Sequence, residues 1–371
     1  MASKKAKIFL RNQTAVFGSV IIILTIVIAF LGYWIMPDAT PNANDRIAEL
    51  KKQAPGFSTE VLLVPRNIKV ENLNFLERWF SGQESAYIAR PFLKYEVLEG
   101  NQKIVLDINN GGESYSKETY TLEDLSGGGD FSMKEILTNQ IERRTYWFGT
   151  DLSGRDMLSK LIFGARISIA IGCITVILSA VIGLLLGSFA GYFGGWVDQV
   201  VLWFMSVVWS VPRIMLVIAI SMALQQVGVW ITFVAVGLTM WVEVARVVRG
   251  KVLEVKEYQY VEAAKSYGAS HIRIILKYIL PSIVGPVVVV FTATFADAIL
   301  IEAGLSFLGL GVKSPMPSWG LMIQEGYAMI TSDGAWYLIF FPAICISLLV
   351  FSFNLVGNGL RDALDPKNVL K

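Results

Sequence analysis

Three ionisable residues lie inside apolar stretches, where a charge is costly. Arg213, Glu243 and Asp297 each interrupt a run of apolar residues long enough to cross a bilayer. A charged side chain near the bilayer centre costs about 2.5–3.5 kcal/mol or more, and such residues usually face a protein interior or a water-filled cavity. We therefore expect the three to line a pathway through the membrane and to interact there. Two simpler alternatives remain open: Arg213 extends to the membrane interface, and Glu243 pairs with Arg246, three residues along the same helix.

The sequence offers little for catalysis or metal binding. Its single histidine, His271, lies in a polar segment, and both cysteines, Cys173 and Cys345, lie in apolar runs without the spacing of metal ligands. The phosphate-binding pattern Gly-x4-Gly-Lys-Ser/Thr does not occur in the sequence. We expect no catalytic residue, no bound metal, no cofactor and no ATP binding by this chain. An intramembrane enzyme is disfavoured for the same reason.

The polar segment at residues 261–281, VEAAKSYGASHIRIILKYILP, separates two long apolar stretches. Gly268 can adopt the left-handed conformation that ends a helix, and Ser270 is a candidate N-cap for a second helix. In that second helix Ile272, Ile275, Leu276 and Ile279 are predicted to share one face, and Pro281 is predicted to lie at the start of the next membrane span. Two short helices meeting at a bend are therefore expected to project from the membrane.

The composition places these residues in a membrane protein. The chain has 371 residues, of which 54% are hydrophobic, and its mean hydropathy is +0.54, well above the average for soluble domains. The net charge of +2 gives no basis for nucleic-acid binding. We expect an all-α polytopic protein in a lipid bilayer.

Apolar stretches of about 20 residues predict six transmembrane helices. They lie at about residues 16–35, 167–189, 200–224, 229–248, 282–301 and 336–356. Gly172, Gly183 and Gly187 in the second span favour close helix contact. A cleaved signal peptide is the competing interpretation of the first stretch, but that stretch ends in Tyr-Trp-Ile-Met-Pro rather than in a small-residue cleavage site.

These spans divide the chain into three regions. Residues 1–36 hold a basic cytoplasmic tail and the first span, residues 37–145 form a polar extracytoplasmic insertion, and residues 146–371 form the main transmembrane domain. The insertion is expected to be α+β or irregular, and residues 95–108 predict a hairpin with its turn at 99–101. A docking surface for a soluble binding protein and a structural cap are both open roles for the insertion.

Charge placement predicts that both termini are cytoplasmic. Lysine and arginine are concentrated in the N-terminal tail, in residues 249–280 and in the C-terminal tail, whereas the short outer connections hold only Lys313. Arg155, Lys160 and Arg166 run against this rule, because they are predicted to lie outside, near the second span. The turn at 191–197 is a second weak point, because it is predicted to lie inside but carries no positive charge.

Four motifs resemble the membrane subunits of dipeptide, oligopeptide and nickel ABC importers, and the resemblance covers roughly residues 147–367. They are the Glu-Ala-Ala loop at 261–281, FGTDLSGRDMLS at 148–159, EAGLSFLGLG at 302–311 with SWG at 318–320, and LRDALDP at 360–366. The resemblance implies the six-helix permease fold of a type I ABC importer, in a C-type subunit, and a location in the plasma (inner) membrane of a prokaryote. The insertion after the first span is much larger than is usual in the family.

The resemblance also implies partners and a site. Residues 250–281, here called the coupling loop, would dock on the ATP-hydrolysing partner. Glu262 would pair there with a basic residue, and the loop would be shaped by Ala263, Ala264, Gly268, Ser270 and Pro281. The partners implied are two ATP-binding-cassette subunits, a second homologous permease subunit and an extracytoplasmic solute-binding protein. The expected function is import of di- or oligopeptides by alternating access, with nickel or another small solute as an alternative.

A self-sufficient secondary transporter is a further alternative from a different class. It predicts inverted internal repeats and interrupted helices, and the sequence contains no convincing internal repeat.

Overall fold

The structure is a computed structural model that describes residues 2–66, 70–98, 100, 102–109, 115–127, 131–224, 228–329 and 335–364. The chain separates into two compact units. The first contains residues 1–27, 167–313 and 344–371, and the second contains residues 28–166 and 314–343. Several long helices pass from one unit into the other, and each unit is described by itself.

Long apolar helices form most of the first unit. Within the described residues, five helices are long and apolar enough to cross a membrane. They are α2 (Gln13–Ile35), α6 (Met157–Phe193), α9 (Val229–Val255), the run from α11 (His271–Ile274) through the π-helical turn η3 (Ile275–Ile279) to α12 (Leu280–Phe307), and α14 (Tyr337–Leu364). The short helix α1 (Ala2–Arg11) precedes α2.

The pair α7 (Gly195–Ser210) and α8 (Arg213–Ala223) supplies a sixth span if it is counted as one. The two helices are bent by 94° at the break between them, so the single straight span predicted at 200–224 is divided. Val211 is extended, with φ −98° and ψ 132°. The residue before a proline avoids the helical region, and Pro212 therefore explains why α7 stops here.

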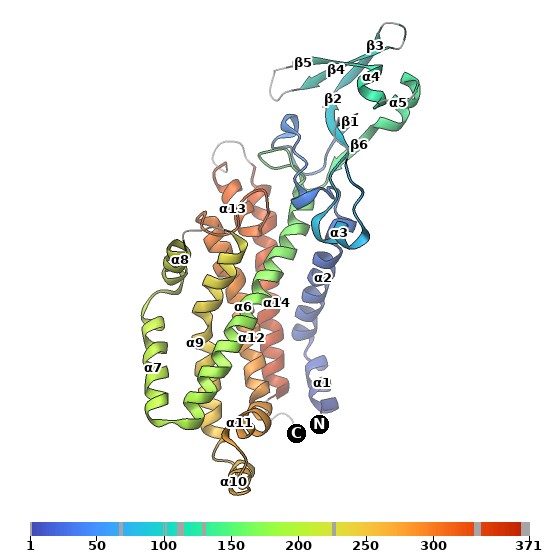
Figure 1. Cartoon of the computed structure of the whole chain (residues 1–371). Helices are drawn as coiled ribbons and strands as arrows, with labels where there is room; N and C mark the ends of the chain where they lie inside the picture. The colour runs from blue at the N-terminus through green and yellow to red at the C-terminus, as the bar shows by residue number, and fades with distance from the viewer. Residues whose placement is uncertain are drawn as a thin grey trace. The chain divides into compact units, whose positions relative to one another are not determined.

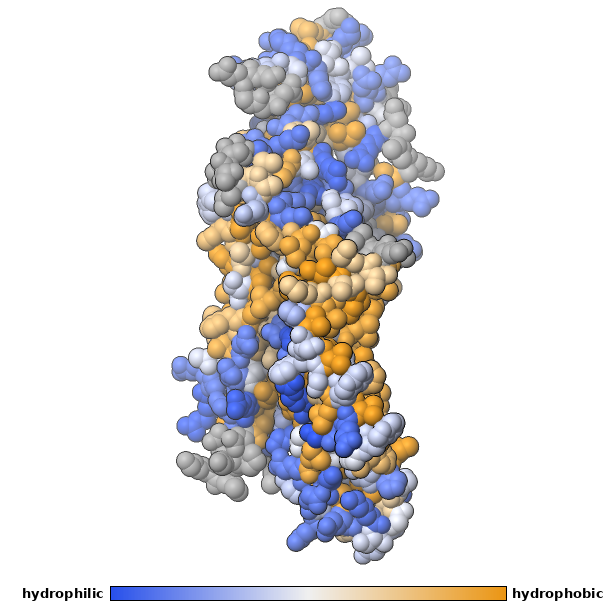
Figure 2. Space-filling view, turned by 90° about the vertical axis from the view of Figure 1, so that its left-hand side faces the viewer, coloured by the Kyte–Doolittle hydropathy of each residue, from blue (hydrophilic) through white to orange (hydrophobic). Residues whose placement is uncertain are grey.

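The predicted fold class, an all-α membrane protein with an extra domain after the first span, is confirmed, with five or six apolar spans among the described residues (Figure 1). In Figure 2 apolar side chains gather over the long helices, and polar side chains gather at the end that carries α10 (Gln259–Ser266). This distribution suits helices in lipid that end in a polar phase.

Glycines allow α6 to pack closely against α9. A Cβ atom added to Gly183 would lie 2.6 Å from Val244 Cβ, and one added to Gly187 would lie 2.6 Å from the carbonyl oxygen of Ala245. A Cβ atom added to Gly191, one turn further on, would lie 2.8 Å from the carbonyl oxygen of Arg249. The glycines recur every four residues on one face of α6, so the predicted close contact through Gly183 and Gly187 is confirmed, and it extends to Gly191. Gly172 has a similar role, because a Cβ there would lie 2.6 Å from the ring of Phe295.

Gly187→Ala is expected to destabilise the protein by about 1–3 kcal/mol, because the added methyl group meets backbone atoms that cannot rotate away. The measurement is the apparent melting midpoint of the purified protein. Gly250→Ala in α9 is the matched control, since a Cβ there meets nothing within 4 Å and alanine favours the helix by about 1 kcal/mol. Equal midpoints for the two variants would contradict the packing argument.

The insertion in the second unit is an α+β domain with two antiparallel sheets. One sheet has the order β2-β1-β6 and the other β3-β4-β5. The strands are β1 (Phe57–Pro65), β2 (Tyr87–Phe92), β3 (Lys94–Leu98), β4 (Lys103–Asn109), β5 (Tyr115–Thr121) and β6 (Ile141–Tyr146). The helices are η1 (Pro41–Ala43), η2 (Ala48–Leu50), α3 (Phe75–Ser81), α4 (Leu122–Ser126) and α5 (Met133–Gln140).

Alternating side chains on β4 build the core of this domain. Ile104, Leu106 and Ile108 are fully buried and pack with Leu62 of β1 and Leu125 of α4. The register places Leu106 between Tyr95 of β3 and Glu118 of β5. The predicted hairpin is confirmed in its strands, while residues 99 and 101 of its turn lie outside the described residues.

Candidate functional site

The coupling loop bends at Gly268. This residue has φ +74°, a region that L side chains rarely adopt. The Gly268 N–H donates to the Lys265 carbonyl oxygen at 2.9 Å, and the Ala269 N–H donates to the Ala264 carbonyl oxygen at 3.1 Å. This pair of hydrogen bonds is the Schellman ending of a helix. Glycine therefore terminates α10 where the sequence predicts.

One side of the coupling loop is packed into the helical unit. Val261 and Ala264 of α10, with Ile274 and Ile279, are buried in a cluster that continues into α9 and α12 through residues such as Val252 and Ile283. Close packing of this kind transmits displacement, because an interior at crystal-like density has little free volume to absorb it. The loop is thus attached rigidly to one end of each of two spans.

The other side of the coupling loop is exposed. Glu262 and Ala263 are exposed on α10, and Tyr267 at the bend is almost entirely so. Ser270 has the backbone conformation of an N-cap, although its side chain makes no cap hydrogen bond. Pro281 is exposed in the first turn of α12.

The predicted apolar face of the second helix is partly wrong. Ile275 and Ile279 are buried, but Ile272 is 64% exposed and Leu276 is 60% exposed. The predicted face assumed a regular α-helix, whereas residues 275–279 form a π-helical turn. A π turn changes the angular spacing of the side chains, and Ile274 is buried in this segment together with Ile275 and Ile279.

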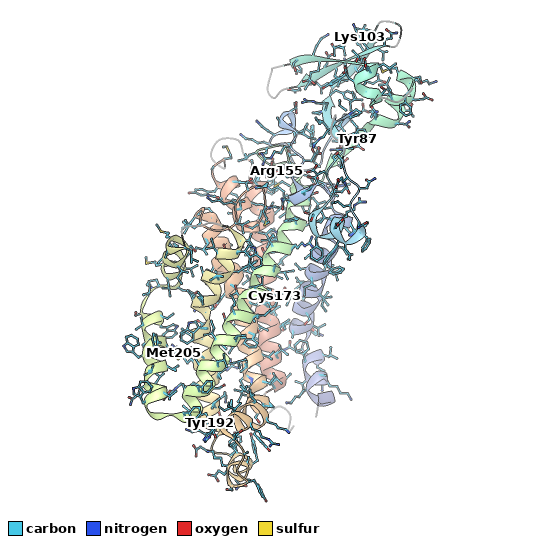
Figure 3. The ribbon with its side chains drawn as sticks, viewed as in Figure 1. Tyr87, Lys103, Arg155, Cys173, Tyr192 and Met205 are labelled. Atoms are coloured by element: carbon cyan, nitrogen blue, oxygen red, sulfur yellow. The ribbon has the colours of Figure 1, made fainter. Side chains whose placement is uncertain are left out.

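Polar contacts connect the coupling loop region to other helices. The hydroxyl of Tyr192, at the end of α6, lies 2.9 Å from Nδ1 of His271 in α11 (Figure 3). Arg249 of α9 donates two hydrogen bonds to the carboxylate of Asp198 in α7, at 2.5 and 2.7 Å. Movement of the coupling loop would thus reach α6 directly, and the end of α9 nearest the loop is joined to α7.

The three intramembrane charges meet, although they come from three helices. Arg213, the first residue of α8, donates through Nη2 to Oε1 of Glu243 in α9. Its Nη1 lies 3.4 Å from Oδ2 of Asp297 in α12. The predicted interaction among the three residues is present, and all three side chains remain partly exposed.

Of the two simpler alternatives, the pairing of Glu243 with Arg246 is not observed. Arg213 holds two carboxylates. Arg246 lies over the ring of Trp209, with its guanidinium carbon 3.3 Å from the ring centroid, rather than against Glu243. A hollow of about 290 Å³ opens beside the cluster, and Arg213, Glu243 and Thr239 supply its polar lining.

A second charge cluster lies in the other unit, at the start of α6. Lys160 Nζ donates to Oδ2 of Asp151 at 2.7 Å and to Oε2 of Glu325 in α13 (Trp319–Tyr327) at 2.8 Å. Arg155, labelled in Figure 3, contacts the same two carboxylates at 2.6 and 3.3 Å. Two cations and two anions balance, which explains how Arg155 and Lys160 can run against the positive-inside pattern. The charge pattern of the sequence marks these two cations as unusual but gives no signal that Glu325 is their partner.

Burial and the two cations act in opposite directions on Asp151. Burial alone would raise the pKa of this carboxyl, but Lys160 and Arg155 outweigh it and hold the pKa below its usual value. The neighbouring Asp156 has no such cation, and burial raises its pKa despite hydrogen bonds from Ser159. The Asp151 carboxyl group is therefore ionised at neutral pH.

Contacts next to this cluster connect the start of α6, where the motif at residues 148–159 ends, to the Ser-Trp-Gly motif at residues 318–320. Trp319, in the SWG segment, donates from its indole N–H to the Leu161 carbonyl oxygen at 3.0 Å. A Cβ added at Gly164 would lie 2.7 Å from the Trp319 ring. Helix α13 thus packs against the first turns of α6, and the Trp319 ring and the ion pairs of Glu325 both stabilise this contact. Over the described part of the chain, no group of three or more His, Cys, Asp or Glu side chains is arranged to hold a metal ion.

Comparison with known proteins assigns a family to this arrangement. Residues 183–369 match the binding-protein-dependent transport system inner membrane component family, and residues 5–55 match the N-terminal TM domain of oligopeptide transport permease C. The chain is 44% identical over 222 residues to the dipeptide transport system permease protein DppC of Bacillus subtilis, covering 60% of this chain and 69% of that protein. It is 40% identical over 230 residues to the glutathione transport system permease protein GsiD of Pectobacterium atrosepticum, covering 62% and 75%.

A solved structure of the MetNI methionine ABC transporter, in an inward-facing conformation, contains a chain similar in fold to 56% of this chain. The similarity covers 98% of that chain, with a TM-score of 0.47 and 19% identity. The sequence match spanning residues 183–369 carries the assignment: this chain belongs to the family of inner membrane components of binding-protein-dependent transport systems.

Proposed function

We propose that the chain forms half of the transmembrane pathway of an ATP-driven importer of di- or oligopeptides, and that separate subunits hydrolyse the ATP. The relatives are named for dipeptide, oligopeptide and glutathione transport, and these names support a peptide-like solute. The observation that carries the proposal is the coupling loop, which is packed on one side and exposed on the other.

The exposed side of the coupling loop has the composition of a docking surface. Tyr267, Ile272 and Leu276 are large, apolar and exposed, and Glu262 adds a negative charge beside them. Buried aromatic and aliphatic anchors with a charged rim are typical of protein interfaces. We infer that this surface inserts into a groove of an ATP-binding-cassette subunit, with Glu262 facing a basic residue.

The attachments of the coupling loop support a route for the motion. Closure of two ATPase subunits around ATP would displace the loop, and the packed cluster at Val261 and Ile279 would carry the displacement into α9 and α12. The Tyr192–His271 contact would carry it into α6. Rigid elements that move as bodies are the usual means of such switching.

Two further kinds of partner are needed if the chain forms only half of the pathway. A second homologous permease subunit would complete the pathway, and an extracytoplasmic binding protein would deliver the solute. Both termini would be cytoplasmic. The basic N-terminal tail would then lie on the same side of the membrane as the coupling loop, which is the side where basic residues are enriched.

The Arg213–Glu243–Asp297 cluster is proposed to line the pathway. A cysteine in place of Asp297, in a protein lacking Cys173 and Cys345, is expected to react with a membrane-impermeant thiol reagent because the Asp297 side chain is partly exposed beside polar groups. The measurement is the extent of labelling with and without ATP. Ala298→Cys is the matched control, since Ala298 is fully buried. Protection of position 297 in every transport state would rule out the pathway role.

The function itself is tested by assembling the chain with candidate partners from the same genome, namely a second permease, two ATPases and a binding protein. ATP hydrolysis and uptake into vesicles would be measured with a panel of dipeptides, longer peptides, glutathione and a nickel chelate. Stimulation by peptides is the expected result. Stimulation only by nickel would reassign the solute, and uptake without any ATPase would favour a secondary transporter.

A further inference from the structure

Helix α3 carries an apolar surface that the insertion itself does not cover. Phe75 is 68% exposed, Leu76 is 66% exposed and Phe80 is 64% exposed. They lie on a helix of seven residues. Burying a side chain of this kind is worth about 1.5–3 kcal/mol, so three on one short helix indicate an apolar environment around it.

This surface continues the apolar surface of the first membrane span. The Trp34 and Phe75 rings lie 5.0 Å apart between centroids, and those of Phe30 and Trp79 lie 4.7 Å apart. The Trp79 indole N–H donates to the Phe30 carbonyl oxygen. Phe30 and Trp34 are themselves exposed on α2, one of the helices long and apolar enough to cross the membrane. Exposed apolar residues of α3 therefore stand against the end of a lipid-facing helix.

Two arginines lie close to the tryptophan rings of this surface. The Arg78 guanidinium lies 5.2 Å from the Trp34 ring centroid. Arg166 lies 4.9 Å from the Trp79 ring centroid and donates to the Trp79 carbonyl oxygen at 2.9 Å. Tryptophan with arginine is typical of the depth at which lipid headgroups meet acyl chains, because the ring is amphipathic and the guanidinium can reach phosphate.

We propose that α3 lies in the headgroup region of the outer leaflet and anchors the insertion to the bilayer that α2 crosses. Phe75, Leu76 and Phe80 enter the acyl boundary, and Arg78 faces lipid phosphates. The occupant of this surface is lipid, because the surface is continuous with that of a membrane span. The proposal does not depend on the solute or on ATP coupling.

The test uses the full-length chain without its two native cysteines, in vesicles of phosphatidylcholine and phosphatidylglycerol. A spin label is placed at Leu76→Cys or Phe80→Cys, and its collisions with oxygen, which concentrates in lipid, and with a water-soluble nickel chelate are compared by electron paramagnetic resonance. Tyr115→Cys on β5 is the matched control, because Tyr115 is 63% exposed, close to the exposure of Leu76 and Phe80, but lies in the β3-β4-β5 sheet, away from α3 in the chain.

The expected result is a ratio of oxygen to nickel collisions several-fold higher at positions 76 and 80 than at position 115. Equal ratios at all three positions would overturn the proposal. An aqueous profile at 76 and 80 that becomes protected only when the solute-binding protein is added would also overturn it, and would identify α3 as a protein-docking surface. All substituted positions are exposed, so folding of the labelled variants is not at issue.

Discussion

Gly268→Val is expected to weaken docking of the ATPase about tenfold or more and to abolish stimulated ATP hydrolysis. The residue has φ +74°, and a Cβ there meets nothing within 4 Å, so the effect comes from the backbone alone. The left-handed conformation costs an L-residue about 1–2 kcal/mol, and a β-branched residue more. Because about 1.4 kcal/mol corresponds to a tenfold change in affinity, the bent loop should become the minor conformation. The measurements are co-purification of the ATPase and stimulated hydrolysis.

Gly268→Asn is the matched control for this prediction. Asparagine tolerates the left-handed region better than other non-glycine residues, and open space surrounds the position. The asparagine variant should therefore retain most of the assembly. If valine and asparagine both left assembly and hydrolysis unchanged, Gly268 would not be the bend on which docking depends.

Glu262→Arg tests the same surface by charge instead of by shape. Glu262 is exposed, so the substitution should leave the apparent melting midpoint of the isolated chain unchanged while it opposes a basic residue on the ATPase. A like-charge contact in an interface costs several kcal/mol. Normal co-purification with a normal melting midpoint would refute the docking assignment of Glu262.

Lys160→Met is expected to produce the largest loss of stability, about 3–5 kcal/mol. The Lys160 side chain is 2% exposed and holds both Asp151 and Glu325. Methionine fills a similar volume but leaves a buried carboxylate short of a cation, and an uncompensated buried charge is more costly than a lost surface pair. The measurement is the apparent melting midpoint of the purified chain.

A surface ion pair supplies the matched control. Lys251 pairs with Glu254 at 2.7 Å, with both side chains largely exposed, and such pairs contribute about 0–1 kcal/mol. Lys251→Met should therefore change the midpoint little. The double variant Lys160→Met with Glu325→Gln should recover part of the loss, since one unpaired charge is removed. Equal effects of Lys160→Met and Lys251→Met would contradict a buried network.

The contribution of Asp151 to the free energy of unfolding depends on pH in a defined direction. Because the cations depress the pKa of Asp151 in the folded state, its stabilising contribution is present above the ordinary aspartate pKa of about 3.9. It is lost only as the pH falls through the still lower folded pKa. In the wild type the contribution of Asp151 to the free energy of unfolding should therefore be constant from about pH 6 to 8.

Local patterns in the sequence determined most of the fold and part of the site. Apolar runs predicted the spans, because a helix in lipid must be both long and apolar. Gly268 predicted the end of α10, because only a few residue types tolerate its backbone conformation. The alternation at residues 95–108 predicted the hairpin. Each of these features depends on residues that lie close together in the sequence.

Contacts between distant residues were decided only by the tertiary structure. Arg213 joins Glu243 and Asp297 across three helices, and Lys160 reaches Glu325 across 165 positions in the chain. Ile272 and Leu276 are exposed because a π turn replaced the expected periodicity. A charge in an apolar stretch indicates that a partner exists. Which residue fills that role depends on how whole helices pack, and packing is a property of surfaces that lie far apart in the sequence.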